Sequence, residues 1–259
     1  MAKHHRGFES LSLRHFFLMP APLEISVIVP VFNEAENIAP LAREILTALS
    51  PLNRPFEIVF VDDASTDATW TNLAAERAKD LRVRGLRHAR NAGQSAAVWT
   101  GLQATTAPIL CTLDGDRQND PADLPRLLAE LAACDFACGA RVNRQDTFVR
   151  RASSSVARAA RRFMLGVDFA DTGCALRAFK RSSLDGLFPF NGLHRFLPVL
   201  VHGGGAKVRE IPVNHRPRVA GVSKYGVWNR LGRGVADLFA LAWYQRRRLR
   251  PVPFTETQP

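Results

Sequence analysis

The sequence predicts an α/β fold with a mostly parallel sheet flanked by helices. Short apolar runs of strand length alternate with longer segments whose apolar residues recur at helical spacing. The chain has 259 residues, 46% of them hydrophobic, which is enough for a full core without disulfides. Carboxylates directly follow two of the apolar runs, and ligands of parallel sheets bind at that edge. The sequence therefore also predicts a ligand site at this edge of the sheet.

Five apolar runs of strand length predict the parallel strands. They cover Glu24–Val31, Phe56–Val61, Val83–Leu86, Ile109–Leu113 and Phe136–Ala140. Between them, apolar residues three and four apart predict amphipathic helices. These helices are expected over Glu34–Leu49, from a Ser65 or Thr66 cap to about Lys79, over Gly93–Ala104, and from Pro121 through Leu124, Leu127, Leu128 and Leu131. The alternation favours parallel strands with helices on both faces.

The pattern changes after residue 141. The elements expected there are an arginine-rich helix over Arg150–Leu165, strands over Cys174–Phe179 and Lys207–Val213, a turn at Gly203–Gly205 and a final helix over about Val227–Gln245. The four cysteines lie in or beside apolar segments, so we interpret them as reduced core residues of a cytoplasmic protein. Cys134 and Cys138 lack a second cysteine pair or nearby histidines, which favours core packing over a zinc site.

The formal net charge is +11, and the positive charge concentrates in Arg141–Arg162 and Lys207–Arg250. Such a balance is typical of proteins that bind nucleic acid, anionic lipid or a phosphorylated substrate. Nucleic acid is disfavoured, because the basic segments are not interleaved with aromatic residues that would stack on bases. No run approaches the roughly 20 apolar residues that a membrane-spanning helix needs, so we predict that the chain does not cross a bilayer.

The final predicted helix is both apolar and basic. Its apolar residues at helical spacing are Trp228, Leu231, Val235, Leu238, Phe239 and Ala242, and Arg246, Arg247, Arg248 and Arg250 follow them. A basic amphipathic helix can lie in a lipid interface. Packing on the protein core is the equally weighted alternative.

Asp114 and Asp116 end the run Ile109–Leu113 and form the most informative pair in the chain. Mg²⁺ and Mn²⁺ prefer oxygen ligands, and Mg²⁺ is usually held by one or two carboxylates plus substrate phosphates. Gln118 offers another oxygen from the same loop, two residues after Asp116 and therefore on the same side of an extended chain. An isolated Asp-x-Asp is more often a solvated turn.

A second pair of carboxylates favours a ligand site over a solvated turn. Asp62 and Asp63 end the run Phe56–Val61, so two acidic strand ends are expected at one edge of the sheet. We therefore predict a metal–nucleotide site. The alternative for Asp62 and Asp63 is capping of the next helix, whose N-terminal dipole favours negative charge.

Several motifs together resemble glycosyltransferase family 2. They are Val29–Asn37, Val61–Asp67, Arg90–Ala96, Leu113–Pro121, Asn143–Asp146 and Gly221–Tyr225. The chain is similar to the branch that loads sugars onto polyprenyl phosphates, which includes dolichol-phosphate mannosyltransferases and undecaprenyl-phosphate aminoarabinose transferases. The resemblance covers roughly residues 24–245. It implies a GT-A fold over 23–245, with a Rossmann-like nucleotide-sugar half (about 23–141) and an acceptor half (about 142–245), between a flexible basic extension (1–22) and a basic tail (246–259).

The resemblance also implies roles for individual residues. Asp116 and Gln118 would bind Mg²⁺ or Mn²⁺, with Asp114 by the ribose and close to the metal. The residues implied in nucleotide binding are Pro30, Phe32, Glu34, Asp62, Asp63, Asp114 and Gly115. Asp63 is our preferred contact to the base, because a carboxylate can accept from a ring N–H, and uracil and guanine both stay open. Glu34 is equally interpretable as a first-turn helix carboxylate.

The acceptor phosphate is expected to meet basic residues of the second half. The implied contacts are Arg141, Arg151, Ser155 (or Ser154), Arg216 and Lys224. A guanidinium offers paired donors that match phosphate geometry. The expected catalytic set is Asp116, Arg141, Arg151 and Lys224. The alternative for this segment is a solvated basic face.

One departure from the family bears on the acceptor. Members that glycosylate hydroxyls carry an acidic pair near the start of a late helix, and the corresponding stretch here is Asn191–Leu197, without a carboxylate. A hydroxyl acceptor needs a base, whereas a phosphate monoester is already ionised near neutral pH. A phosphate acceptor is therefore favoured. His194 could act as a base, but a structural or acceptor-contacting role is preferred.

The expected function is inverting sugar transfer from a UDP- or GDP-sugar to a polyprenyl phosphate. Relatives often have transmembrane helices after the catalytic domain, whereas this sequence has no apolar run of that length. We therefore expect peripheral contact at the cytoplasmic face through the final helix, or an integral-membrane partner or homo-oligomer. The alternatives are transfer to a saccharide or other hydroxyl, nucleotidyl transfer, and a non-enzymatic basic binding protein.

Overall fold

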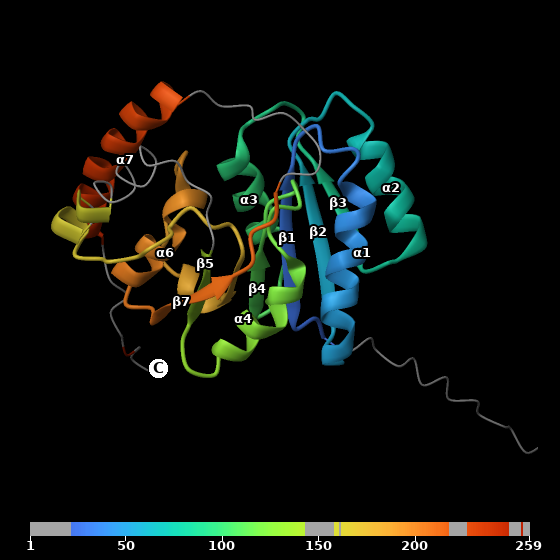
Figure 1. The fold of residues 1–259 in the computed structure, drawn as a ribbon, viewed down its shortest axis with the longest axis horizontal. Helices are drawn as coiled ribbons and strands as arrows, with labels where there is room; N and C mark the ends of the chain where they lie inside the picture. The colour runs from blue at the N-terminus through green and yellow to red at the C-terminus, as the bar shows by residue number, and fades with distance from the viewer. Residues whose placement is uncertain (1–21, 143–157, 161, 218–226, 249–254, 256–259) are drawn as a thin grey trace, which may run out of the picture.

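The computed structural model describes residues 22–142, 158–160, 162–217, 227–248 and 255. These residues form a seven-stranded sheet in the order β3-β2-β1-β4-β6-β5-β7 (Figure 1). The strands are β1 (Ile25–Val31), β2 (Phe56–Asp62), β3 (Val83–Arg87), β4 (Ile109–Thr112), β5 (Phe136–Arg141), β6 (Arg177–Lys180) and β7 (Val208–Val213). The predicted α/β class is confirmed.

The sheet is mostly parallel, as predicted, and β6 is the strand that runs against its neighbours. It pairs antiparallel with both β4 and β5, while β1 pairs parallel with β2 and β4. The chain moves outward from β1 to β2 and β3 and then returns to β4 on the other side of β1. Such a reversal leaves a crevice at the carboxyl ends of the two strands, where ligands of open α/β sheets bind.

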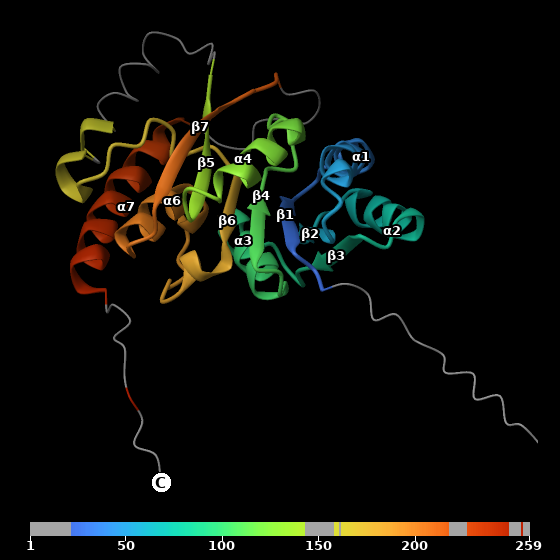
Figure 2. The ribbon, with the colours of Figure 1, turned by 90° about the horizontal axis from the view of Figure 1, so that it is seen from below.

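Helices cover both faces of the sheet (Figure 2). The helices are α1 (Ile38–Leu49), α2 (Thr69–Lys79), α3 (Gln94–Gln103), α4 (Leu124–Glu130), α6 (Leu193–Gly203) and α7 (Val227–Arg247), with short 3₁₀ turns at Ser50–Leu52, Pro121–Asp123 and Arg181–Leu184. α1, α2 and α4 pack over one face, and α3, α6 and α7 over the other. No helix among the described residues is long and apolar enough to span a membrane.

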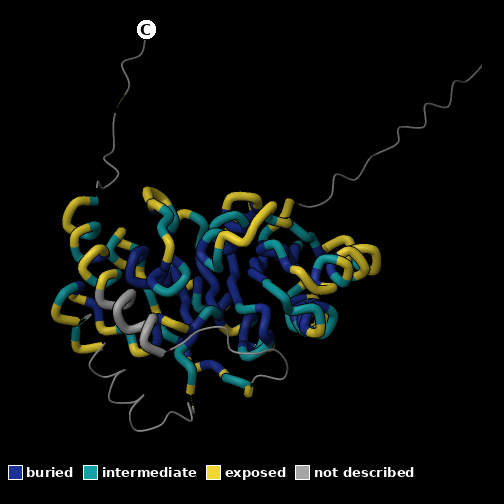
Figure 3. Tube along the Cα trace, turned by 90° about the horizontal axis from the view of Figure 1, so that it is seen from above, coloured by how far each residue is buried: buried dark blue, intermediate teal, exposed yellow. Residues whose placement is uncertain are grey.

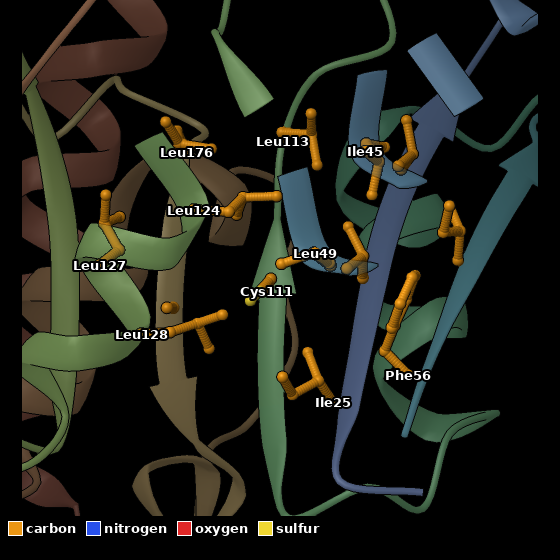
Figure 4. Close-up of a cluster of buried hydrophobic side chains, with 14 of the residues drawn as sticks. Ile25, Ile45, Leu49, Phe56, Cys111, Leu113, Leu124, Leu127, Leu128 and Leu176 are labelled. Carbon is orange, nitrogen blue, oxygen red and sulfur yellow. The ribbon is translucent and has the colours of Figure 1, made fainter. Parts of the chain in front are cut away.

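Two hydrophobic clusters fill the space between sheet and helices. The strands are the most buried part of the molecule, and the outer helix faces are exposed (Figure 3). On one face, Ile45 and Leu49 of α1 and Leu124 and Leu128 of α4 meet the sheet (Figure 4). The four cysteines are reduced and buried, so the core interpretation is confirmed.

Two predicted helix starts were wrong, for one shared reason. α1 begins at Ile38 rather than Glu34, and α2 begins at Thr69 rather than after Ser65 or Thr66. Asn33 lies at φ +52°, and its backbone N–H donates to the Ser65 hydroxyl at 2.8 Å. The backbone N–H of Thr66 donates back to the Asn33 side chain at 2.8 Å. The expected caps therefore tie the β1–α1 and β2–α2 loops together.

Candidate active site

A cavity of about 400 Å³ lies at the carboxyl ends of β1 and β4, where the strand order reverses. Its polar and charged lining includes Gln94, Thr112, Asp114, Arg141, Arg177, His194 and Arg195. Asp114 is the one carboxylate among the described lining residues, against three arginines. The cavity therefore suits an anionic ligand.

Asp114 follows β4 directly and is held on two sides. Its carboxylate accepts from Gln94 Nε2 at 2.7 Å, and its backbone N–H donates to Asn119 Oδ1 at 3.3 Å. Burial, and then repulsion from Asp116, raise the pKa of Asp114 to about 6, against the opposing pull of Arg177 and Arg141. Two mutually repelling carboxylates form a place where a cation would lower the electrostatic energy.

The donor set fits a hard divalent cation that the protein holds in part. Asp116 is buried, with 9% of its surface exposed, and its Oδ1 accepts from the backbone N–H of Gln118 at 3.1 Å. Within the described residues, no three His, Cys, Asp or Glu side chains gather as a complete metal site. Asp114, Asp116 and Gln118 would therefore share a cation with phosphate oxygens of a ligand, as is common for Mg²⁺.

Gly115 brings the loop of residues 114–118, which carries the candidate cation ligands and is called the metal loop below, against β1. A Cβ at this position would lie 2.6 Å from Val31 Cγ1 and 3.1 Å from the Pro30 carbonyl oxygen. Gly115 is among the residues that the family resemblance implies in nucleotide binding. In the fold, Gly115 lies close to the end of β1, and Pro30 and Asp114 both line the cavity there.

Asp62 and Asp63 lie at the same edge as Asp114, because β1, β2 and β4 are parallel. Asp63 is engaged within the protein: it accepts from His88 Nδ1 at 2.7 Å and from the backbone N–H groups of Ala92 (2.8 Å) and Gly93 (2.7 Å). It thereby holds the loop that leads into α3, the helix that carries Gln94. The two predicted acidic strand ends are connected through this loop.

Asp62 is fully buried and faces protein groups as well. Its Oδ1 accepts from the Ser65 backbone N–H at 2.9 Å. Its Oδ2 lies 3.2 Å from Arg87 Nε, which is close enough for an ion pair, although the geometry is not that of a hydrogen bond. Asp62 thus shapes the start of the β2–α2 loop.

The β1–α1 loop borders the site. Pro30 lines the cavity, and Phe32 is half-buried two residues later. Glu34 precedes α1 and accepts from Asn37 Nδ2 at 2.6 Å. It is therefore a carboxylate of the turn that enters the helix.

Arg141 lines the cavity at the end of β5. Its Nε and Nη2 donate to the two oxygens of Asp171, at 2.6 and 2.8 Å, in a paired arrangement. Burial lowers the pKa of Arg141, but the Asp171 carboxylate outweighs burial and raises it above the ordinary value. The backbone N–H groups of Ala170 and Asp171 donate to Glu210 at 2.8 Å, which fixes the partner in turn.

Arg216 is held beside the metal loop. Its guanidinium donates to Glu44 at 2.7 Å and to Asp120 at 2.6 Å, and its backbone N–H donates to the Gln118 carbonyl at 2.9 Å. Arg216 therefore braces the loop that carries Gln118. The predicted residues Arg151, Ser154, Ser155 and Lys224 lie outside the described residues.

His194 lies in the first turn of α6 and lines the cavity. Its Nδ1 is 2.6 Å from the hydroxyl of Ser95, which also accepts from the Gly192 backbone N–H at 2.8 Å. Burial, and then the charges of Arg195 and Arg177, lower its pKa to about 3. A group with so low a pKa is a poor base at neutral pH.

Three residues of the site were not predicted from the sequence: Arg177, Gln94 and Asp171. Arg177 is 2% exposed and projects from β6 into the lining of the cavity. The signal was an arginine inside the apolar run Cys174–Phe179, because a charge within a buried strand is seldom kept for packing alone. Gln94 lies within the family motif Arg90–Ala96, whereas no sequence pattern around Asp171 indicated a role in the site.

A comparison with family models matched residues 26–188 to the family described as glycosyl transferase family 2. A dodecaprenyl-phosphate galacturonate synthase from Rhizobium johnstonii is 35% identical over 238 residues, which cover 90% of this chain and 70% of that protein.

Solved structures resemble the fold at low identity. A glucosyl-3-phosphoglycerate synthase from Mycobacterium tuberculosis, in complex with Mg²⁺ and UDP, superposes with a TM-score of 0.61 at 20% identity, covering 87% of this chain and 80% of that one. A mannosyltransferase from Pyrobaculum calidifontis, in complex with GDP-Man and Mn²⁺, has a TM-score of 0.58 at 21% identity, covering 89% of this chain and 66% of that one.

Proposed function

Because the chain belongs to glycosyl transferase family 2, we propose that it transfers a sugar from a nucleoside-diphosphate sugar to a polyprenyl phosphate, with inversion at the anomeric carbon. The chain is a glycosyltransferase, and its fold is of the GT-A type. The donor nucleotide, the acceptor, the cation and the stereochemistry belong to the proposal.

The observation that carries the proposal is the charge distribution of the cavity. The carboxylates Asp114 and Asp116 lie beside Arg141 and Arg177, near enough to shift the pKa of Asp114. A cation bound by the carboxylates would face the donor diphosphate, and Arg141 would face the acceptor phosphate. Two anionic substrates need such an arrangement, because they otherwise repel each other as they approach.

The proposed reaction is an in-line displacement. An oxygen of the acceptor phosphate attacks the anomeric carbon and forms the new C–O bond. The bond from that carbon to the diphosphate oxygen breaks, and the nucleoside diphosphate leaves with the electron pair. Asp114, Asp116 and Gln118 would hold Mg²⁺ or Mn²⁺, which would offset the charge that grows on the leaving diphosphate. Arg141, with Arg151 and Lys224, would position the anions.

A phosphate acceptor agrees with the lack of a suitable base. A hydroxyl acceptor needs a group that takes up its proton, and the pKa of His194 is lowered to about 3. A phosphate monoester is largely ionised near pH 7 and needs no such group. The Rhizobium johnstonii relative is named for a dodecaprenyl phosphate, which supports the same acceptor class here. Its name also makes an acidic sugar one candidate donor beside neutral sugars.

The donor nucleotide and the cation are proposed from the solved structures. Their ligands include UDP with Mg²⁺ and GDP-Man with Mn²⁺, so both bases and both ions are candidates for this chain. Pro30, Phe32 and Gly115 border the space where a nucleotide would reach the metal loop. Asp62 and Asp63 would act indirectly, by holding the β2–α2 loop and the loop before α3 in place around the nucleotide.

Contact with a membrane surface through α7 completes the proposal. A polyprenyl phosphate carries its phosphate at a lipid surface, so the cavity must come close to one. Phe239 and Trp243 of α7 are 64% and 66% exposed, and the exposed Arg246 and Arg247 follow them on the helix. Aromatic side chains next to arginines are typical of helices that lie in a lipid interface.

The decisive measurement combines nucleotide binding with turnover. Calorimetric titration with UDP and GDP, each with and without Mn²⁺, is expected to show metal-dependent binding of one nucleotide. With the matching nucleotide sugar, the protein is expected to glycosylate a polyprenyl phosphate and release the nucleoside diphosphate. Asp116→Asn keeps the shape of the side chain but removes its charge, and we expect it to lower turnover by about 100-fold or more.

Asp80→Asn is the matched control, because Asp80 is paired with Arg82 on the surface at the start of the turn before β3. Full turnover by the Asp116→Asn variant at saturating metal would contradict the assigned role of the metal loop. Release of pyrophosphate would indicate nucleotidyl transfer instead, and turnover with soluble sugar acceptors alone would indicate a hydroxyl acceptor.

A further inference from the structure

Arg177 is a buried cation without a charged partner at hydrogen-bonding distance in the described structure. It is 2% exposed, its Nη2 donates to the Thr172 carbonyl at 3.1 Å, and its Nε has no hydrogen-bond partner among the described residues. Burial lowers the pKa of Arg177, yet an arginine stays protonated in proteins. An unpaired buried charge destabilises a fold, so its presence calls for a ligand that pairs with it.

The nearby carboxylates are already engaged by other side chains. The two oxygens of Asp171 accept from Nε and Nη2 of Arg141, and Asp114 accepts from Gln94. Arg177 is also the only fully buried charged residue among the described residues that line the cavity. The inner part of the cavity thus holds a guanidinium that no protein carboxylate neutralises through a direct bond.

The register of the sheet places Arg177 deeper than the metal loop. Arg177 of β6 pairs with Thr112 of β4, two residues before Asp114. A donor diphosphate held at Asp114 and Asp116 would lie at the end of β4, and the sugar attached to it would extend along the cavity. A substituent of the sugar is then placed to reach Arg177.

We propose that Arg177 binds the carboxylate of an acidic donor sugar, so that the enzyme selects a uronic acid over the corresponding neutral hexose. The inference rests on the proposed transfer from a nucleotide sugar. The planar guanidinium offers two parallel donors that match a carboxylate, and a neutral hydroxymethyl group would leave the buried charge unpaired. Selection then comes from the cost of that unpaired charge as much as from the bond gained.

The test compares acidic and neutral donors. Turnover is measured with UDP-galacturonate and UDP-glucuronate against UDP-galactose and UDP-glucose, with polyprenyl phosphate as acceptor. If the calorimetric titration shows binding of GDP and not of UDP, the acidic and neutral donors compared are GDP-mannuronate and GDP-mannose. The wild type is expected to prefer an acidic donor, and Arg177→Gln is expected to reduce the ratio of acidic to neutral kcat/KM by about 10- to 100-fold, the range of a hydrogen bond to a charged group. Arg177→Lys should reduce it less.

Arg181→Gln is the matched control. Arg181 follows β6 and donates to the carbonyls of Ala107 and Leu102 and to the hydroxyl of Thr105, so its role is structural. Its variant is expected to lose thermal stability and to keep the wild-type donor ratio. Arg177→Gln is expected to keep or gain thermal stability without ligand, because it removes an unpaired buried charge.

Other outcomes overturn the proposal in distinguishable ways. If Arg177→Gln weakened binding of the free nucleoside diphosphate, the residue would bind the diphosphate. If it raised KM for polyprenyl phosphate with every donor, the residue would bind the acceptor. A wild type that prefers neutral donors refutes the carboxylate assignment but leaves the proposed function intact. Lack of metal-dependent binding of both UDP and GDP, together with no turnover of any of these donors, refutes both.

Discussion

At the scale of single residues, the protonation of His194 is decided by its surroundings. The ring is packed at the start of α6, bonded to Ser95, and close to Arg195 and Arg177. Burial, and then the charges of Arg195 and Arg177, disfavour the charged form and lower the pKa of His194. His194 is therefore neutral near pH 7 and serves to join α6 to α3.

This environment predicts acid sensitivity that originates at His194. Its pKa is lowered from 6.5 to about 3 in the folded protein, so below pH 6.5 the unfolded chain takes up a proton that the native state does not. The contribution to stability is complete above pH 6.5 and is lost as the pH falls towards 3. Between pH 7.5 and 5.0 the expected loss is roughly 2 kcal/mol.

His194→Asn should remove that part of the pH dependence, because asparagine can accept from Ser95 but does not titrate. Urea unfolding of both proteins at pH 7.5 and 5.0 measures the difference. Equal loss of stability in the variant and the wild type would contradict the lowered pKa. Turnover of the variant near the wild-type pH optimum would further separate His194 from a role as base.

Asp63 shows at the same scale how tertiary contacts redirect a residue. A carboxylate at the end of β2 is available, by sequence, for a ligand N–H. In the fold both of its oxygens accept from the α3 entry loop, at His88, Ala92 and Gly93. Asp63 thus acts on the site through Gln94, which follows that loop and bonds to Asp114.

At the scale of elements, the metal loop depends on how closely β4 can end beside β1. Gly115 leaves no room for a side chain between itself, Val31 and Pro30. Asp114 and Asp116 flank this contact, so a displacement of the loop would move both carboxylates. The loop is also braced from outside by the ion pairs of Arg117 and Arg216 with Glu44.

Gly115→Ala is expected to destabilise the protein by about 1–3 kcal/mol through overpacking. It should also weaken metal-dependent nucleotide binding, because the added Cβ pushes the loop away from β1. Thermal unfolding and calorimetry with the nucleotide and Mn²⁺ provide the two readings.

Gly101→Ala separates these two effects. A Cβ at Gly101 would meet the side chain of Ile28 between α3 and the sheet, away from the metal loop. It should destabilise the fold and leave nucleotide affinity largely intact. Similar losses of affinity in both variants would show that Gly115 matters only for stability.

At the scale of the whole molecule, α7 has two different sides. Leu238, Leu241 and Ala242 pack into the cluster shared with α3 and α6, and Leu241 is 1% exposed. Phe239 and Trp243, one turn apart, are exposed. Phe188 is exposed as well, and its backbone N–H donates to the Tyr244 hydroxyl of α7. Packing on the core and contact with lipid are alternatives in the sequence, but they are compatible on different sides of one helix.

The double variant Phe239→Ser and Trp243→Ser is expected to bind anionic vesicles at least tenfold more weakly, because each aromatic side chain contributes roughly 1.5–3 kcal/mol when buried in lipid. Flotation with vesicles of phosphatidylglycerol and phosphatidylethanolamine measures the binding. Nucleotide affinity should be unchanged, since these residues lie outside the cavity lining.

Leu81→Ser is the control for loss of an exposed apolar residue. Leu81 is 77% exposed and precedes β3 at the opposite edge of the sheet from β7. It should bind vesicles as the wild type does. Unchanged vesicle binding by the double variant would place the membrane contact elsewhere.

The sequence by itself determined the succession of elements and the acidic ends of two strands. These features are local: a strand of apolar residues that ends in Asp114-Gly115-Asp116 is visible in eight consecutive residues. The helix starts at Ile38 and Thr69 could not be read from the sequence, because Asn33 and Ser65 join the β1–α1 and β2–α2 loops across 32 residues.

Only the tertiary structure decided which charges meet. Arg141 finds Asp171 across 30 residues, His194 finds Ser95 across 99, and the reversed strand β6 carries Arg177 between β4 and β5. Burial and partner choice set the protonation and the ligand preference of such groups, and both depend on contacts between segments far apart in the chain. Local periodicity carries no information about these contacts.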